Sequence, residues 1–223
     1  MLDLISIHIP KTAGTSFYAI LKQVYGEELS APFRRRDILN RRNNEYFDAN
    51  TLPPHIRILH GHFYYSEIAN LHRTDRSKLV CWLREPVERL ISNYLFFKAG
   101  LENPERNPEQ YELNKHRLNE SLLEYAERLE NRNRISEFLH GSNLEDFFFC
   151  GRMSHYEEDI RHLGRQLGWP PNLPIPTLNR GAKQSHSTTT LSTKVLYQLE
   201  EWNSEDLALY RRFLANIDRS TVV

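Results

Sequence analysis

The chain has 223 residues, enough for one ordinary domain, and its composition argues against several classes of protein. Lys and Arg together number 29, as do Asp and Glu, so the formal net charge is zero and a globally basic nucleic-acid-binding protein is disfavoured. With 11 Tyr, 11 Phe and 3 Trp, the chain is too rich in aromatic residues for a disordered one. Cys81 and Cys150 lie in apolar runs, which predicts buried reduced thiols instead of a disulfide scaffold or a zinc site.

The chain shows no sequence signal for a membrane. It contains no run long and apolar enough for a membrane span, and its N-terminus lacks the profile of a signal peptide. The first residues lead directly into the apolar segment LDLISIHI, which we interpret as a first strand. We therefore expect a cytoplasmic protein whose fold starts at Met1. A relative from which an anchor had been removed would look the same, and this alternative stays open.

Apolar runs of β type alternate with amphipathic patterns along the chain. We expect strands over residues 4–9, 56–62, 78–83 and 146–150. Helical periodicity predicts helices over residues 14–25, 86–95, 118–129, 135–139, 157–167, 193–202 and 205–215. Irregular segments are expected over residues 31–54, 100–116 and 170–190. This order predicts a single domain over residues 1–223, of the α/β class, with a P-loop-like three-layer architecture in which helices flank a mainly parallel central sheet.

The ends of the first three predicted strands carry the residues with the most chemistry. In parallel sheets, ligands bind beyond the carboxyl ends of the strands. Those ends carry Pro10-Lys11-Thr12, His60-Gly61-His62 and Arg84. We therefore expect these residues to converge on one site.

The segment PKTAGTS, residues 10–16, has the pattern of an anion-binding loop between a strand and a helix. Backbone N–H groups at a helix N-terminus bind anions, three hydroxyls add donors, and Lys11 adds a positive charge. The segment is not a Walker A motif, because its lysine precedes the loop, and no convincing magnesium-binding carboxylate follows the later strands. An ordinary turn with a chance lysine stays the alternative. The residues assigned to this site are Lys11, Thr12, Ala13, Gly14, Thr15 and Ser16.

A second anion site is expected after the third strand. Arg84 ends that strand, and Ser92 lies two turns into the following helix. A guanidinium group and a hydroxyl placed in this way can hold a phosphate from two sides. Alone, Arg84 would more simply be a surface ion-pair partner of Glu85 or Glu88. Together with the first loop, the phosphate-binding interpretation is the better one.

These two motifs together resemble those of the sulfotransferases that use 3′-phosphoadenosine 5′-phosphosulfate (PAPS). HIPKTAGTSF is similar to their 5′-phosphosulfate loop, and LREPVERLISNYLFF to their 3′-phosphate motif. The nearest resemblance is to the carbohydrate branch, and within it to the heparan sulfate 2-O-sulfotransferase-like enzymes, which carry similar PKT-x-x-TS, H-G-H and R-[DE]-P-[IV]-E-R-L-x-S runs. The resemblance is strong over residues 5–26 and 56–98 and weaker over residues 146–190.

The resemblance implies a catalytic base in the H-G-H segment. We assign it to His62, with His60 supporting or sharing the role; residues two apart on a strand place their rings on the same face. An imidazole suits this task, because it can accept a hydroxyl proton near neutral pH. Lys11 would stabilise the charge that develops on the leaving phosphate oxygen. A structural histidine pair is the alternative, and no metal is predicted, because no third ligand follows at a suitable spacing.

Three further segments receive weaker assignments. The resemblance extends to the loop LNRGAKQSHSTTT, residues 178–190, where it implies phosphate contacts from Arg180, Ser185 and Thr190, with Lys183 a further candidate. The run RRRDILNRR, residues 34–42, is either a solvated helix face or an acceptor groove for an anionic glycan. The aromatic residues 63–65 line a sugar site or pack in the core.

The predicted function is transfer of a sulfonate from PAPS to a hydroxyl, on a glycan or glycolipid that can itself be anionic, by in-line displacement, with adenosine 3′,5′-bisphosphate (PAP) as product. The chain is much shorter than animal Golgi enzymes of this kind, so a bacterial surface-polysaccharide precursor and a small hydroxylated metabolite stay open as acceptors. Two alternatives come from other classes: a Mg²⁺-dependent nucleotide kinase or NTPase, and a non-catalytic nucleotide-binding protein.

Overall fold

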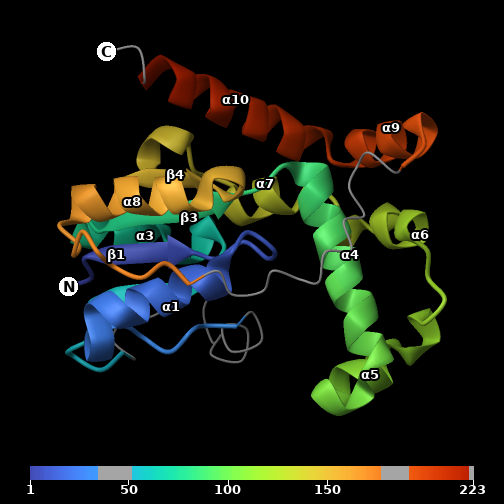
Figure 1. Cartoon of the computed structure of the whole chain (residues 1–223), viewed down its shortest axis with the longest axis horizontal. Helices are drawn as coiled ribbons and strands as arrows, with labels where there is room; N and C mark the ends of the chain where they lie inside the picture. Colours follow the sequence, from blue (N-terminus) through green and yellow to red (C-terminus); the bar gives the residue numbers. More distant parts are fainter. Residues whose placement is uncertain (35–51, 177–190, 221–223) are drawn as a thin grey trace. The chain divides into compact units, whose positions relative to one another are not determined.

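The structure is a computed structural model that describes residues 1–34, 52–176 and 191–220 (Figure 1). These residues form two compact units, which are described separately. The first unit comprises described residues up to Arg84 together with residues 135–176, and the second comprises residues 85–134 and 191–220. The expectation of a single domain over residues 1–223 stays a prediction.

The first unit is built on a sheet of four strands in the order β2-β1-β3-β4. Every neighbouring pair is parallel, so the predicted α/β fold with a parallel central sheet is confirmed. The strands are β1 (Leu4–Ile7), β2 (Ile58–Gly61), β3 (Lys78–Leu83) and β4 (Phe149–Arg152). The carboxyl ends of all four therefore lie at one edge of the sheet, the edge at which the sequence predicts a ligand site.

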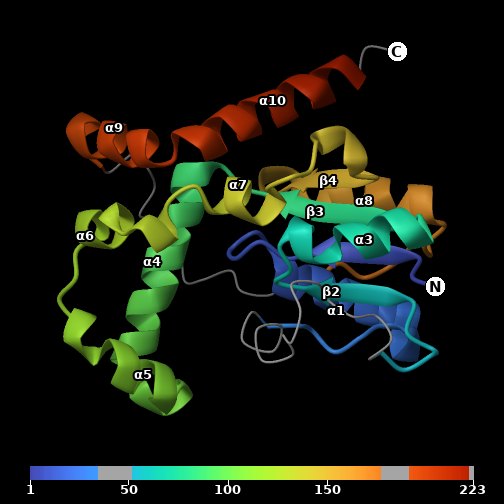
Figure 2. The same cartoon turned by 180° about the vertical axis from the view of Figure 1, so that it is seen from behind.

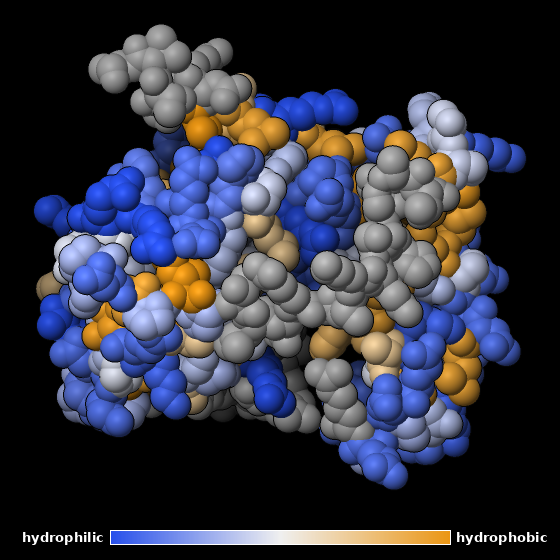
Figure 3. All heavy atoms as spheres, in the orientation of Figure 1, coloured by the Kyte–Doolittle hydropathy of each residue, from blue (hydrophilic) through white to orange (hydrophobic). Residues whose placement is uncertain are grey.

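Helices cover both faces of this sheet, which gives the three predicted layers. Helices α1 (Gly14–Tyr25) and α8 (Tyr156–Leu167) lie on one face, and α3 (Tyr65–Asp75) lies on the other (Figures 1 and 2). The core under α1 and α8 is apolar and closely packed; it includes Leu4, Phe17, Ile20, Leu21, Ile58, Val80, Trp82, Ile160 and Leu163. Helix α8 is amphipathic, and its outer face belongs to the largely hydrophilic surface in Figure 3.

The glycine of the H-G-H segment is explained by a close approach of two backbones. Phe33 N–H donates to the carbonyl of His60 at 3.0 Å, and His62 N–H donates to the carbonyl of Phe33 at 2.8 Å. A Cβ atom on Gly61 would lie 2.5 Å from Cβ of Phe33 and 2.7 Å from its carbonyl oxygen, closer than any side chain allows. Glycine at this position lets Phe33 pair with the end of β2, and this pairing holds the backbone of His62 in place.

The second unit is helical. It contains α4 (Pro86–Glu102), α5 (Pro108–Asn114), α6 (Leu122–Glu127), α9 (Thr193–Trp202) and α10 (Ser204–Ser220), while α7 (Arg134–Leu139) begins at its boundary with the first unit. Helix α4 starts as the sequence predicts, with Pro86 in its first turn and the Glu85 carboxylate accepting the Glu88 N–H at 2.7 Å. Its apolar stripe packs into a core that includes Val87, Leu90, Ile91, Tyr125, Ala126 and Leu199.

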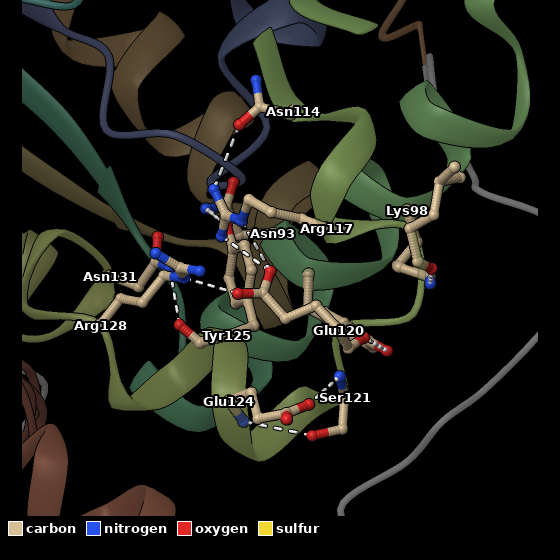
Figure 4. Close-up of polar contacts among 12 residues, drawn as sticks. Asn93, Lys98, Asn114, Arg117, Glu120, Ser121, Glu124, Tyr125, Arg128 and Asn131 are labelled. Carbon is tan, nitrogen blue, oxygen red and sulfur yellow. Dashed lines mark hydrogen bonds and ion pairs between the residues drawn. The ribbon is translucent and has the colours of Figure 1, made fainter. Parts of the chain in front are cut away.

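A buried carboxylate organises the connection between α5 and α6 (Figure 4). Glu120 is 9% exposed and receives Arg117 at 2.8 Å and Arg128 at 2.5 Å. Its backbone carbonyl also accepts the Tyr94 hydroxyl at 3.0 Å. These contacts bring the side chains of Arg117 and Arg128 together at one buried carboxylate, which fixes the chain between α5 and α6.

Three elements differ from the sequence prediction. Helix α3 was not predicted, because its apolar pattern is short: Tyr65 and Ile68 are its only fully buried apolar residues in the described structure. The segment 100–116, predicted to be irregular, contains α5. The fourth strand begins at Phe149, three residues later than predicted, because residues 144–146 form a 3₁₀ turn.

The two cysteines are register partners on β3 and β4, with their sulfur atoms 3.6 Å apart as free thiols. Cys81 is fully buried, as predicted, and burial raises the pKa of its thiol well above the ordinary value; Cys150 is half-buried. Among the helices described, none is long and apolar enough to cross a membrane.

Candidate active site

Four polar side chains form a block across two neighbouring strands of the first unit. Ser6 on β1 is the register partner of His60 on β2. His8 and His62 lie two residues beyond Ser6 and His60, directly after β1 and β2. All four side chains therefore share the face of the sheet that α1 covers. The His8 ring stacks on His62 with ring centroids 4.2 Å apart and on His60 with centroids 5.1 Å apart. The prediction that His60 and His62 project from the same face is confirmed.

His62 is held in one tautomer by a backbone contact. Its Nδ1 lies 2.7 Å from the carbonyl oxygen of His8. A carbonyl oxygen can only accept, so Nδ1 must carry the proton and donate it. In the neutral ring, Nε2 then keeps its lone pair and is the atom able to accept a proton. The ring is half-buried, so it retains access to a ligand.

His60 is placed differently from the predicted second base. It is 1% exposed, and its Nδ1 lies 2.9 Å from the Ser6 hydroxyl. Burial, with a smaller contribution from His62, lowers its pKa to about 3, so the ring is neutral at physiological pH. Because a buried ring has no access to an acceptor, this geometry favours the supporting role for His60 over a shared one.

His8 is a functional candidate that the sequence reasoning missed. Its N–H donates to the carbonyl of Gly61 at 2.7 Å, its own carbonyl accepts from His62, and its ring stacks on the rings of both His60 and His62. Burial, then the charges of His60, His62 and Lys11, lower its pKa well below the ordinary value, which keeps it neutral. The available signal was the alternation of polar residues at positions 6, 8, 60 and 62 within otherwise apolar strands.

The histidine block does not have the form of a metal site. Rings stacked face to face do not direct their nitrogen atoms toward one point. Within the part of the chain that the structure describes, no group of three or more His, Cys, Asp or Glu residues could hold a metal ion.

The loop before α1 has an unusual backbone. Lys11 and Ala13 adopt left-handed conformations, with φ of 71° and 66°, although neither is glycine. Such conformations cost of the order of 1 kcal/mol each and cluster at ligand sites. The N-cap residue of α1 is Ala13, whose side chain makes no capping hydrogen bond. The first-turn N–H groups of such a helix, at Gly14, Thr15 and Ser16, lie where helix N-termini bind anions.

The three hydroxyl residues of this loop differ in burial. Thr12 is 1% exposed, and its hydroxyl donates to the carbonyl of Ile9 at 2.8 Å. That hydroxyl proton holds the loop, so a contact of Thr12 with a ligand would come through its N–H, and the assignment of Thr12 to the site stays a prediction. Thr15 is exposed and Ser16 is buried.

Of the other predicted site residues, the structure describes Arg84 and Ser92 but not those of the loop 178–190. Arg84 directly follows β3, the strand beside β1, and is half-buried at the edge where β1 and β2 end. Ser92 lies on α4 in the second unit, so its pairing with Arg84 stays a prediction. Arg180, Lys183, Ser185 and Thr190 lie outside the described residues, as does the arginine run after Arg34.

The three aromatic residues after His62 have different roles. Phe63 and Tyr65 are 0% and 3% exposed, so both pack in the core. Tyr64 is half-buried, its ring packs against Phe138 with centroids 4.8 Å apart, and its hydroxyl donates to Glu137 at 3.0 Å. Of the three, Tyr64 is therefore the candidate for an acceptor contact.

Comparisons with known proteins identify the family. The model of the Sulfotransferase family matches residues 2–213. Among solved structures, a sulfotransferase from Alicyclobacillus acidocaldarius is similar, with 15% identity and a TM-score of 0.49 over 96% of each chain. The mouse sulfotransferase SULT7A1 complexed with PAP is similar, with 10% identity and a TM-score of 0.47 over 76% of this chain and 60% of that one. A search of curated proteins found no match.

Because the family match spans most of the sequence, the chain belongs to the sulfotransferase family. Members of this family take a sulfonate from PAPS, so the predicted enzyme class and cofactor are confirmed, in preference to a nucleotide kinase or NTPase.

The buried histidines predict a pH dependence of stability. The pKa of His60 is about 3 in the folded protein and 6.5 as its ordinary value, so the unfolded state binds a proton below pH 6.5 that the folded state does not. Stability therefore falls as the pH is lowered through this window. Between pH 7 and pH 5 we expect His60 to contribute a loss of about 2 kcal/mol in the free energy of unfolding. Urea unfolding of the wild type and His60→Gln at both pH values measures this; an equal loss in both proteins would contradict it.

Proposed function

We propose that this sulfotransferase transfers the sulfonate to a carbohydrate hydroxyl, with His62 as general base, as in the heparan sulfate 2-O-sulfotransferase-like branch. The observation that carries the proposal is the bond from His62 Nδ1 to the His8 carbonyl, which leaves the lone pair on Nε2. The H-G-H segment that the sequence shares with that branch supports the assignment of the branch. A cytoplasmic location, expected from the sequence, stays a prediction.

The residues present fit the donor PAPS. The N-terminus of α1, with Ala13 as its N-cap residue, and the left-handed loop at Lys11 and Ala13 would hold its 5′-phosphosulfate. Arg84, at the end of the neighbouring strand, would hold the 3′-phosphate, with Ser92 as its predicted partner. When bound, PAPS supplies the sulfonate and, as leaving group, the phosphate of PAP.

The chain's own residues then perform three tasks. His62 Nε2 accepts the proton of the acceptor hydroxyl as that oxygen bonds to sulfur. Lys11 places positive charge beside the loop, where negative charge develops on the phosphate oxygen as its bond to sulfur breaks. The buried apolar strand ends and the neutral His8 and His60 keep the base in a site of low polarity, where these electrostatic effects are stronger than in water.

A screen of acceptors tests the proposed function. We expect PAP release from PAPS to accelerate with neutral and anionic oligosaccharides or glycolipids, in a manner that requires His62. Phenols and simple alcohols, offered at the same concentrations, are the matched acceptors. Turnover with these but not with any sugar would contradict the carbohydrate assignment. Tight PAP binding without turnover on any acceptor would favour the non-catalytic alternative.

Arg84→Ala is expected to weaken binding of PAP by about 10- to 100-fold, because a charge-assisted contact of this kind is worth about 1.5–3 kcal/mol. Affinity for adenosine 5′-phosphosulfate, which lacks the 3′-phosphate, should change little. Arg57→Ala is the control, since Arg57 is an exposed arginine of the same unit that pairs with Asp3 before β2 begins. Calorimetric titration measures both affinities, and equal losses for the two nucleotides would refute the 3′-phosphate role.

A further inference from the structure

We propose that His8 is a positioning residue, whose ring fixes the His62 imidazole relative to the phosphosulfate loop of residues 10–16. The inference rests on the proposed role of His62 as the base. It assigns to His8 no contact with the reacting atoms. The ring instead couples two parts of the site that come from different strands.

The first support is the packing of the rings. The His8 and His62 rings are nearly parallel, with an interplanar angle of 23° and centroids 4.2 Å apart, so one face of the base is covered by His8. The His8 ring also stacks on the buried His60 ring, with centroids 5.1 Å apart, and His60 is anchored by the Ser6 hydroxyl. The half-buried base is thus connected through His8 to a ring that is fixed in the core.

The second support is the contact with the loop. A Cβ atom built on Gly14 would lie 1.9 Å from Cδ2 and 2.0 Å from Nε2 of His8. The edge of the His8 ring therefore lies directly against the backbone of the first residue of α1. Glycine at position 14 leaves the room that the ring occupies, and this explains why the loop reads A-G-T at this point.

The geometry gives the ring a function that the backbone of His8 does not perform alone. The carbonyl of His8 sets the tautomer of His62 through Nδ1, and the Phe138 ring contacts the imidazole at an interplanar angle of 69°, with centroids 6.4 Å apart. The stacked His8 ring lies nearer, with centroids 4.2 Å apart, and limits both the tilt of the imidazole and the distance of Nε2 from the loop. Misplacement of a reacting group by about 1 Å can reduce a rate by about 100-fold, so a ring without catalytic contacts can have a large effect.

The test compares two substitutions that both keep the His8 carbonyl. His8→Ala removes the ring and should reduce kcat by about 10- to 100-fold, with affinity for PAP nearly unchanged. His8→Phe retains a flat ring without nitrogen atoms and should recover most of that loss. Nitrogen NMR of the PAP-bound proteins should find His62 protonated at Nδ1 in all three proteins, because all keep the His8 carbonyl, so that the loss of kcat in His8→Ala reports the position of the ring and not its tautomer.

Full activity in His8→Ala, while His62→Ala is inactive, would overturn this inference and leave the proposed base intact. An inactive His8→Phe would also overturn it, because a ring nitrogen would then be required. Retention of activity in His62→Ala would instead overturn the proposed function.

A double-mutant cycle with Gly14 keeps the inference testable if His8→Ala folds poorly. Gly14→Ala should disturb the His8 ring and lower kcat, and it should cost less in the His8→Ala background, where the added methyl group has room. Strictly additive effects of the two substitutions on kcat would contradict the coupling.

Discussion

His62→Ala is expected to lower kcat by about 100- to 10,000-fold, the range over which a positioned general base contributes to catalysis. The affinity for PAP should be nearly unchanged, because His62 is assigned to the acceptor side of the reaction. The physical basis is the Nδ1 contact with the His8 carbonyl at 2.7 Å. Because Nδ1 carries the proton of the neutral imidazole, Nε2 is the ring atom that can take the proton of the acceptor hydroxyl.

His62→Asn separates catalysis from structure in this experiment. Its side-chain amide can still donate to the His8 carbonyl but offers no imidazole lone pair, so we expect it to be as inactive as His62→Ala and better folded. His55→Asn is the control, since His55 is exposed and precedes β2. Single-turnover rates at saturating PAPS measure the effect, and a His62 variant that keeps the wild-type rate would eliminate this base.

Lys11→Met is expected to lower kcat by about 100- to 1,000-fold, comparable to the loss of one group that stabilises a developing oxyanion. Lys11 directly follows Pro10 after β1, and its left-handed backbone, with φ of 71°, is fixed by a loop that Thr12 anchors to Ile9. Its charge acts on the same site as the base, because it is one of the charges that lower the pKa of His8.

Lys22→Met provides the matched control, since Lys22 is an exposed lysine in the last turn of α1. Lys11→Arg retains the charge and should recover part of the rate. Measurement of kcat with PAPS at saturation decides the point. A decrease confined to the affinity for PAPS, with kcat unchanged, would show that Lys11 only binds the donor.

Much of the first unit could be predicted from local sequence. Apolar runs predict β1 to β3 within two residues, since buried parallel strands consist of nearly continuous β-branched and aliphatic residues. Pro86 and the stripe after it predict the start of α4 for the same local reason. The loop 10–16 was recognisable because small residues, hydroxyls and a lysine follow a strand directly.

The rest depends on contacts between distant residues. The importance of His8 follows from the register of β1 with β2, which lie about fifty residues apart in sequence, and no local pattern specifies that register. The hydrogen bond from the Thr12 hydroxyl to the Ile9 carbonyl likewise could not be predicted. It depends on the left-handed backbone of Lys11 and Ala13, which is unusual for residues other than glycine. Helix α3 was missed locally, but the need for a crossover between parallel strands argues for it.

The most direct test of the account is calorimetric titration of the protein with PAP, in the presence of a chelator, beside ATP with Mg²⁺. The account predicts tight, metal-independent binding of PAP, weakened in Arg84→Ala, and weak binding of Mg·ATP. Failure to bind PAP, or a preference for Mg·ATP, would contradict the assignment of the loop 10–16 and Arg84 as the site that holds the sulfonate donor.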